Sequence, residues 1–361
     1  MKAAVSMALA AVLFAGCGSG NQPEKNKNTR QEVNVFSGEA QGTTYNIRYI
    51  GDYAPDALKS ELDSILKDID RSLSTWDPTS LITELNKADS GTTPFDDHYD
   101  YFTEVYKAAR GVYTITDGAF DPTVGPLVEA WGFGLKNREN MTDAKVDSLI
   151  PLVGFTHENV RLSRTEEEGQ GTPGRMLYKR LPGMQLDFNA IAQGYSVDVL
   201  GRYLESVGIQ AYMVELGGEV LARGTKPEAQ PWKIGIDKPE EQATERTLQA
   251  TVQLQDLAIA TSGNYRKFYV INGQKYAHTI DPKTGYPVKH GLLSATVVAD
   301  VCWKADAYAT AFMVMGVERS RAFLESEKNP GLEAYLIYSE GEAVRTYTTP
   351  GLANRMEELG N

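Results

Sequence analysis

Hydrophobic residues recur at spacings of three and four in three stretches of the chain, which predicts helices with one apolar face. Pro55 opens the first of these helices, and Gly111 and Gly208 are the expected stops of the second and third. A fourth helix is predicted from a run rich in alanine, which has a high helix propensity. The four predicted helices cover residues 58–73, 102–109, 191–207 and 303–315.

Between these helices, runs of β-branched and aromatic residues, or apolar residues alternating with polar ones, predict strands. Gly217-Gly218 interrupts one predicted hairpin, and Asn272-Gly273 suits the turn of another, because a type I′ turn needs two positive φ angles. Thr261 to Gly263 are expected to form a small turn that could hold an anion. The predicted strands and hairpins lie within residues 33–50, 212–223, 248–254, 267–271, 274–280, 292–299 and 334–347.

The N-terminus has the pattern of an export signal. An apolar run over residues 3–15 is too short to span a bilayer, and small residues precede Cys17 as in a bacterial lipobox, where the cysteine is diacylated. A plain secretory peptide with an incidental cysteine is the alternative. Residues 18–32 are polar and fit a flexible tether. We therefore expect a signal peptide over 1–17, a tether over 18–32 and one domain over 33–361, in an extracytoplasmic lipoprotein that faces the periplasm.

Composition narrows the classes of partner. The chain of 361 residues has 42% hydrophobic residues, enough for a sizeable core, and a formal net charge of −12. Because no basic cluster interleaved with aromatic residues occurs, we expect no nucleic-acid partner. If Cys17 carries lipid, the second cysteine, Cys302, has no disulfide partner and is most simply explained as a buried apolar residue.

His278 is the candidate general base. It lies near the end of the second strand of the later hairpin, before a turn with Pro282 and Gly285 at positions that favour these residues. An imidazole that titrates near neutral pH and stands beside a rigid turn can accept a proton from a substrate. A histidine hydrogen-bonded to the turn, with no part in chemistry, fits the same residues.

Asp306 and Thr310 are the candidate metal ligands. They lie four residues apart on the fourth predicted helix, so a carboxylate and a hydroxyl project from one face. Hard oxygen ligands of this kind suit Mg²⁺. A capping aspartate and a threonine bonded to the preceding turn are the alternative.

Three further segments could contribute to a pocket. Asp187 and Asn189 precede the third helix, where residues of this type cap helices or reach a ligand. The segments 117–122 and 131–134 are rich in glycine and aromatic residues, and such segments can line a site for a flat ring, although loop packing explains them equally well.

Nine motifs, in order along residues 37–350, closely resemble those of the ApbE family, the periplasmic FAD:protein FMN transferases. Each motif alone is weak, but a chance match of all nine in order is very improbable. The motifs are Gly42-Thr43, Leu73 to Trp76, Asp117 to Val124, Trp131 to Gly134, Ala190 to Tyr195 with Asp198, Gly217-Gly218, Thr261 to Gly263, His278 to Pro282 with Thr284-Gly285, and Ala305 to Ala307 with Ala309 to Ala311.

The resemblance implies a single α+β catalytic unit, similar to the T-fold, with mostly antiparallel sheets and packed helices. It implies that Mg²⁺ is held by Ala190, through its main-chain carbonyl, and by Asp306 and Thr310. Gln193 stands where the family often has Lys or Glu, and Gln41 where methionine is frequent. The implied flavin-nucleotide contacts are Gln41, Trp76, Ala119, Phe120, Asp121, Asp187, Gln193 and Ile280.

The activity that the resemblance implies is Mg²⁺-dependent transfer of FMN from FAD to a threonine or serine of a target protein, with release of AMP. The implied acceptor is a subunit of a sodium-pumping quinone reductase or a related electron-transport complex. Two alternatives stay open at this point: an FAD pyrophosphatase that gives the phosphate to water, and a lipoprotein that binds flavin without catalysis. A binding protein has no need of a metal site beside a histidine, which favours the two enzymes.

Overall fold

The computed structural model describes residues 32–134, 139–164, 174–239, 247–264, 268–271, 274–277 and 279–359, with backbone alone for 268–271 and 274–277. The predictions made for residues 1–31, for the Asn272-Gly273 turn and for His278 lie outside these ranges.

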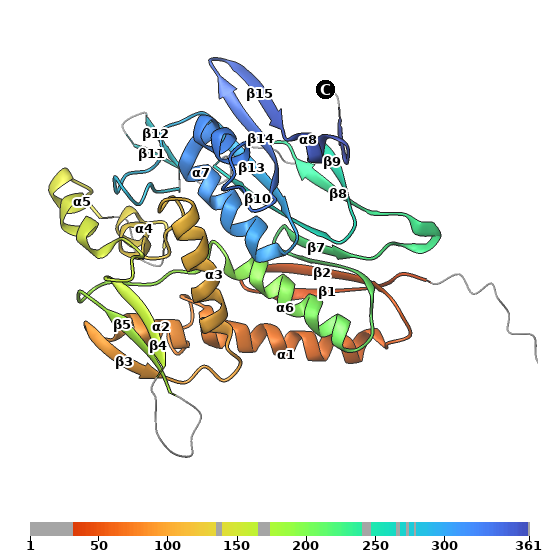
Figure 1. Cartoon of the computed structure of the whole chain (residues 1–361), viewed down its shortest axis with the longest axis horizontal. Coiled ribbons are helices and arrows are strands. Elements are labelled where there is room, and N and C mark those ends of the chain that lie inside the picture. Colours follow the sequence, from red (N-terminus) through yellow and green to blue (C-terminus); the bar gives the residue numbers. More distant parts are fainter. Residues whose placement is uncertain are drawn as a thin grey trace, which may run out of the picture. The chain divides into compact units, whose positions relative to one another are not determined.

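An eight-stranded antiparallel sheet is the largest element of the described part of the chain (Figure 1). Its strand order is β1-β2-β6-β7-β10-β13-β14-β15. The strands are β1 (Asn34–Ala40), β2 (Thr43–Ile50), β6 (Ala211–Leu216), β7 (Glu219–Arg223), β10 (Leu257–Gly263), β13 (Leu292–Ala299), β14 (Glu333–Glu340) and β15 (Ala343–Thr348).

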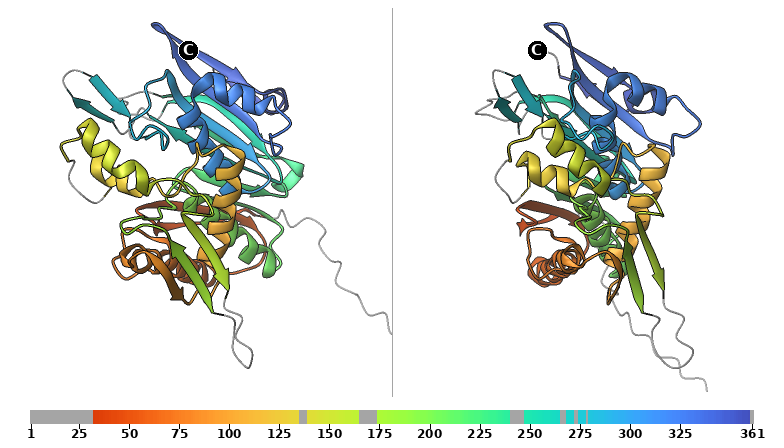
Figure 2. Two further views of the ribbon diagram at one scale, coloured as in Figure 1. Left: turned by 60° about the vertical axis from the view of Figure 1, so that its left-hand side comes forward. Right: turned by 90° about the vertical axis from the view of Figure 1, so that its left-hand side faces the viewer.

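Three long helices cover one face of this sheet: α1 (Pro55–Leu73), α6 (Ala192–Ser206) and α7 (Cys302–Leu324). α7 packs on β10 and β13, and α6 packs on β6, β7 and α7, as Figure 2 shows from two further sides. The apolar side chains of α1 recur at helical spacing, and its Leu58, Leu62 and Leu66 are fully buried in one core with the sheet.

A smaller sheet covers part of the opposite face. In β13, Val297 packs toward the helices while its neighbour Val298 joins the core on the other side, because successive side chains of a strand point to opposite faces. Both faces are therefore buried, and this strand is almost wholly apolar. The covering elements are β8 (Trp232–Asp237), β9 (Leu248–Leu254), β16 (Met356–Glu358) and the short helix α8 (Pro350–Ala353).

The remaining elements belong neither to the large sheet nor to the layers described above. They include a three-stranded sheet of order β3-β5-β4 and a hairpin, β11-β12. These elements are β3 (Gly91–Phe95), β4 (Val160–Arg164), β5 (Arg175–Lys179), β11 (Phe268–Ile271), β12 (Gln274–Ala277), α2 (Leu81–Lys87), α3 (Tyr101–Ile115), α4 (Gly125–Trp131), α5 (Asp143–Leu149) and two 3-10 turns, Ile150–Leu152 and Pro227–Ala229.

The α+β class and its mostly antiparallel sheets are confirmed, as are the predicted helices α1 and α6 and the strand β13. Two predicted helix ends are wrong. α3 continues through Gly111, because that glycine keeps a helical conformation, and the chain first turns left-handed at Asp117 and Gly118. α7 continues beyond Met315 to Leu324 through a kink at Gly316, whose φ is 74°.

Two predictions near the later hairpin also need correction. Thr261 to Gly263 are the last residues of β10, paired with β13, and do not form a turn. The second hairpin strand ends at Ala277 instead of Ile280, which forms an isolated bridge with Pro287. The turn after it is confirmed, because the Gly285 N–H donates to the Asp281 carbonyl at 2.8 Å and Gly285 has a φ of 76°.

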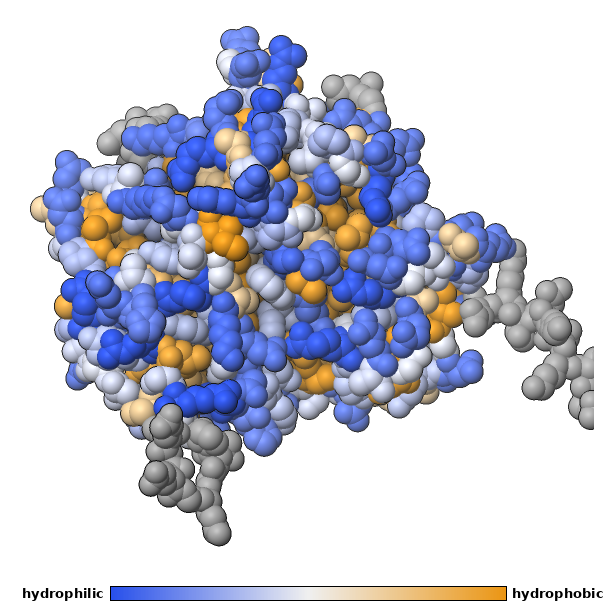
Figure 3. Space-filling view, viewed as in Figure 1, coloured by the Kyte–Doolittle hydropathy of each residue, from blue (hydrophilic) through white to orange (hydrophobic). Residues whose placement is uncertain are grey.

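The face of the molecule seen in Figure 3 is mainly hydrophilic, with hydrophobic residues in small groups. In the ranges that the structure describes, no helix combines the length and the apolar character needed to cross a membrane. Cys302 is fully buried, as predicted for a small apolar residue.

Lys179 is a charged side chain inside the protein. It is only 2% exposed, and burial lowers the pKa of its amine. Its Nζ lies 2.7 to 3.3 Å from four main-chain carbonyl oxygens, which ties the end of α2 to β5 and to the segment that precedes Asp187. These carbonyls belong to Leu85, Asn86, Ala88 and Met184.

Replacing Lys179 by Met should lower the free energy of unfolding by about 3 kcal/mol, because several buried carbonyls lose their donor. Urea denaturation measures this change. Lys87→Met is the matched control, since Lys87 is exposed and donates to the Pro78 carbonyl at the surface, and it should stay within about 0.5 kcal/mol. Equal effects of the two substitutions would contradict a structural role for Lys179.

Candidate active site

A cavity of about 1050 Å³ lies where α6 and α7 meet the ends of several strands of the large sheet. All eight predicted nucleotide contacts line it, and so do Ala190 and Thr310 of the predicted metal site. Asp306 does not line the cavity, because it is 5% exposed and lies one helical turn before Thr310 on α7. The structure thus brings together residues that lie as far apart in the sequence as Gln41 and Thr310.

The wall of the cavity has two kinds of surface. Apolar side chains come mainly from α1, α4, α7 and the loops beside them: Ile69, Leu73, Trp76, Phe120, Val128, Phe133, Met313 and Val314. Polar groups and glycines come from the ends of strands of the large sheet, the start of α6 and the third turn of α7: Gly42, Thr43, Gln193, Gly217, Ser262, Gly263 and Thr310. Such a wall suits a ligand with a flat apolar part and a strongly polar part.

Two hairpin turns of the sheet meet at this wall. The β1–β2 turn is Gln41-Gly42, with φ angles of 52° and 71°, and the β6–β7 turn contains Gly217, with a φ of 65°. The Gly217 N–H donates to the Thr44 carbonyl at 3.0 Å, which holds the two turns side by side. The Gln41 amide also donates to the Ser196 hydroxyl at 2.7 Å, so Gln41 is anchored to α6.

Asp121 and Asp187 support the loops on the apolar side. One Asp121 oxygen accepts from the N–H and hydroxyl of Thr123, and the other accepts from the Phe155 N–H, so this carboxylate is engaged within the protein. Burial raises the pKa of Asp121 and of Asp187. Asp187 accepts from the Asn189 N–H and does not cap α6, which begins at Ala192; the predicted N-cap is therefore wrong.

The helices α6 and α7 cross very closely at Gly194. A Cβ atom on this residue would lie 2.6 Å from the Cys302 carbonyl oxygen and 2.8 Å from the Asp306 Cβ, so only glycine fits. The Gly194 N–H donates to Asp306 Oδ2 at 3.1 Å, although its partner in a regular helix would be the carbonyl of Ala190. The crossing therefore places Asp306 beside the predicted main-chain ligand.

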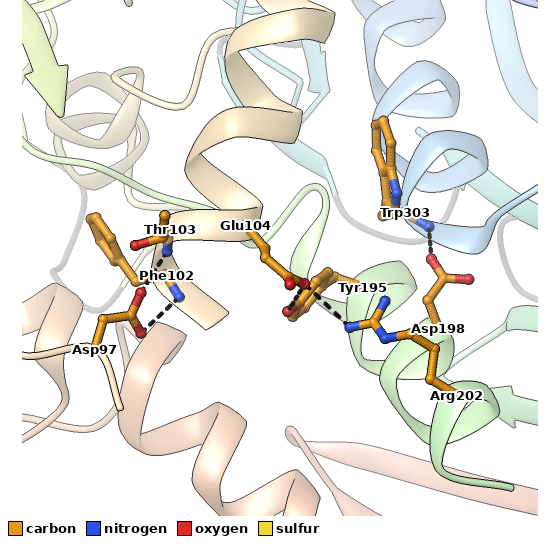
Figure 4. A network of polar contacts seen from close by, with 8 residues as sticks. All are labelled: Asp97, Phe102, Thr103, Glu104, Tyr195, Asp198, Arg202 and Trp303. Carbon is orange, nitrogen blue, oxygen red and sulfur yellow. Dashed lines mark hydrogen bonds and ion pairs between the residues drawn. The ribbon is translucent and has the colours of Figure 1, made fainter. Parts of the chain in front are cut away.

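Asp198 fixes the start of α7. Its two carboxylate oxygens accept the N–H groups of Cys302 and Trp303, both at 2.8 Å, although burial raises the pKa of Asp198 to about 6. Figure 4 shows the bond from Trp303 to Asp198 and, beside it, Glu104 of α3, which accepts from the Tyr195 hydroxyl and pairs with Arg202 of α6. The helix that carries Asp306 is thus held at its N-terminus by a neighbouring helix.

The residues present fit a hard divalent cation. Asp306 is a buried acid, and burial raises its pKa to about 7. No ion pair between described residues involves Asp306, and the Thr310 hydroxyl lies 3.2 Å from that of Ser262. Among the residues that the structure describes, no three His, Cys, Asp or Glu side chains form a metal-binding group, so a cation here would also use hydroxyl and carbonyl oxygens.

Two acidic residues at the site were not predicted. Asp70 of α1 lines the cavity between Ile69 and Leu73, and burial raises its pKa. Glu219 begins β7 directly after the Gly217-Gly218 turn and is 8% exposed. The apolar pattern of its helix gives no signal for Asp70. For Glu219 a signal was available, because an acid directly follows the two glycines that interrupt a predicted hairpin.

His278 itself is outside the described residues, but its surroundings in the sequence are well placed. Thr279 and Ile280 line the cavity. The Thr279 hydroxyl donates to Asn264 at 2.8 Å, and its carbonyl accepts from the Val288 N–H at 3.0 Å. The chain on the C-terminal side of the candidate base is therefore fixed at the cavity wall.

The raised pKa of Asp306 predicts a pH-dependent effect on stability. Between pH 4 and pH 7 the folded state keeps a proton that the unfolded state loses, so the contribution of Asp306 to stability falls as pH rises. Asp306→Asn cannot titrate. The free energy of unfolding of this variant minus that of the parent should therefore rise across this range and level off above it.

The measurement is urea denaturation at a series of pH values with EDTA present. Thr310→Val is the control, because it alters the same site without removing a titratable group, and its difference from the parent should not vary with pH. A flat difference for Asp306→Asn would contradict a raised pKa of this buried acid.

Comparisons with known proteins agree with this arrangement. The model of the ApbE family matches residues 41–336. The FAD:protein FMN transferase of Vibrio cholerae is 36% identical over 326 residues, 89% of this chain and 90% of its own length. That of Escherichia coli K12 is 33% identical over 350 residues, covering 96% of this chain and 95% of its own.

A solved structure gives the same result. The flavinyl transferase ApbE of Pseudomonas stutzeri, in its apo form, superposes with a TM-score of 0.76 at 32% identity, over 90% of this chain and 96% of that one. The residues that match the family model, 41–336, include every residue that lines the cavity. The chain belongs to the ApbE family.

Proposed function

We propose that this protein transfers FMN from FAD to a hydroxyl group of a target protein and releases AMP. The observation that carries the proposal is that all eight nucleotide contacts implied by the sequence line one cavity, next to two of the three implied metal ligands. Its volume of about 1050 Å³ is at the upper end for small-molecule sites, about 300–1,000 Å³, as a dinucleotide requires.

The two kinds of wall suit the two chemical parts of FAD. Phe120, Phe133 and the rim residue Trp76, which is 59% exposed, offer apolar and aromatic surface to a flat ring. Thr43, Ser262 and the glycines of the turns offer hydroxyl and main-chain groups to the pyrophosphate. Such binding holds the reacting phosphate next to the α6–α7 crossing.

We further propose that Asp306, Thr310 and the carbonyl of Ala190 hold Mg²⁺. A bound magnesium ion would neutralise charge on the pyrophosphate as the P–O bond to AMP breaks. The crossing at Gly194 fixes the position of Asp306, and the cap at Asp198 fixes the start of its helix.

The acceptor hydroxyl, of a threonine or serine, attacks the phosphorus of the FMN half. A new P–O bond forms, the bond to AMP breaks with its electron pair, and the hydroxyl proton must leave. We assign that proton to His278, because a histidine with a pKa of about 6.5 can accept it at neutral pH. Lys283, in the turn that follows, pairs with Asp117 and is not free to serve as the base.

The target and the location complete the proposal. The acceptor is a subunit of a sodium-pumping quinone reductase or a related electron-transport complex, and the protein acts outside the cytoplasm, held to a membrane by lipid on Cys17. The sequence of residues 1–17 supports the anchor.

Incubation with FAD, Mg²⁺ and such an acceptor tests the function. Mass spectrometry should find the acceptor heavier by one FMN and an equal amount of AMP. AMP without an adduct would replace the transferase by an FAD pyrophosphatase, and neither product would leave a protein that only binds flavin.

Asp306→Ala should abolish Mg²⁺-dependent transfer, because it removes the one carboxylate among the proposed ligands, while FAD still binds through the apolar wall. Rates come from the FMN adduct and affinity from flavin fluorescence. Ser294→Ala, a buried position on β13, is a control for general damage to the core and should keep most of the activity. Undiminished transfer by Asp306→Ala would rule out the proposed metal site.

His278→Ala should lower the transfer rate by about 10²- to 10⁴-fold with little change in FAD affinity, the usual contribution of a positioned base. The parent rate should also fall as pH drops below the pKa of the histidine, because an imidazolium cannot accept a proton. A structural histidine would instead lower the melting temperature and leave the pH profile of the folded fraction unchanged. Transfer at close to the parent rate would exclude the assigned role.

A further inference from the structure

Glu219 has a buried carboxylate that lacks part of its hydrogen bonding. It begins β7, and its side chain is 8% exposed. Its Oε2 atom is buried without a hydrogen-bond partner, and none of the ion pairs between described residues involves it. A buried acid with an unpartnered oxygen lowers the stability of the protein unless a cation or a hydrogen-bond donor contacts that oxygen.

The groups around Glu219 are acidic. Burial raises the pKa of Glu219, and the charges of Asp306 on α7 and of Glu215 on β6 raise it further. Burial raises the pKa of the Cys302 thiol, and the charges of Asp198, Glu219 and Asp306 raise it further. Gln193, the nearby side chain of α6, carries no charge that could compensate them.

The free oxygen points to the wall of the cavity. A Cβ atom on Gly217 would lie 3.3 Å from Glu219 Oε2 and 3.1 Å from Gln193 Nε2. Gly217 and Gln193 both line the cavity. Because Gly217 has no side chain, the carboxylate of Glu219 is screened from the polar end of the cavity by little more than main chain.

We propose that Glu219 supplies a further carboxylate oxygen to the cation site of Asp306, Thr310 and Ala190. The inference rests on the proposed function, since it assumes a divalent cation at that site. Mg²⁺ takes six oxygens in near-octahedral geometry. Four from the protein leave two positions for phosphate oxygens or water. The orphaned oxygen of Glu219 then gains a partner, and the acidic cluster gains a positive charge at its centre.

Binding of Mn²⁺, a paramagnetic substitute for Mg²⁺, tests this proposal without FAD and without turnover. The EPR signal of free Mn²⁺ gives the dissociation constant for the parent and each variant. Glu219→Gln and Glu219→Asp should each weaken binding by about 10- to 100-fold, the first because it removes the charged ligand and the second because it withdraws the oxygen.

Glu215→Gln is the matched control. Glu215 lies at the other side of the same turn, and its oxygens already accept from the Asn46 amide and the Gly218 N–H. The Glu215→Gln variant loses the same charge as Glu219→Gln. Its affinity for Mn²⁺ should stay within about threefold of that of the parent. Without metal, Glu219→Gln should melt no lower than the parent, because it removes a buried acid; a lower melting temperature would point to a structural role instead.

The other possible results of the Mn²⁺ titrations lead to different conclusions. If Asp306→Ala loses Mn²⁺ and Glu219→Gln binds it as the parent does, Glu219 is not a ligand and the proposed function stands. If Glu219→Asp binds as the parent does while Glu219→Gln is weaker, charge alone acts and the direct contact is overturned. If Asp306→Ala also binds as the parent does, the metal site of the proposed function fails, and this inference fails with it.

Discussion

The close contact between α6 and α7 is the constraint on which the site depends. Gly194 permits it, because any side chain would meet the main chain of α7. Asp198, one turn further along α6, accepts two N–H groups at the start of α7 and fixes the direction of that helix. The two contacts fall four residues apart, on one face of α6. A single helix face therefore decides where Asp306 and Thr310 lie.

Burial gives this arrangement an electrostatic character. Asp198, Glu219 and Asp306 are each 8% exposed or less, and burial is the largest cause of the raised pKa of each. Two main-chain N–H groups compensate Asp198, whereas one N–H reaches Asp306 and the outer oxygen of Glu219 has none. The Asp198 carboxylate is thus the best compensated of the three, and a cation bound beside Asp306 and Glu219 would compensate the other two.

The sequence predicted the parts of the structure that depend on local pattern. Pro55 and the apolar spacing of α1 located that helix, and Gly217-Gly218 located a hairpin turn. The helix end predicted at Gly111 was wrong because packing of α3 outweighs the low helix propensity of one glycine. The pairing of β2 with β6, far apart in sequence, leaves no local signal. Motif order identified the lining of the cavity, but not Glu219, whose importance arises from burial.

The lining residues run from Gln41 to Val314, with contributions from the turns of the sheet, α1, α4, α6, β10 and α7. Because the last of them belong to the final long helix, a chain growing from the ribosome contains no complete site until most of its length has been made. Completion of the site is therefore coupled to completion of the fold, because a truncated product that lacks α7 has neither Asp306 and Thr310 nor the part of the wall that Met313 and Val314 form.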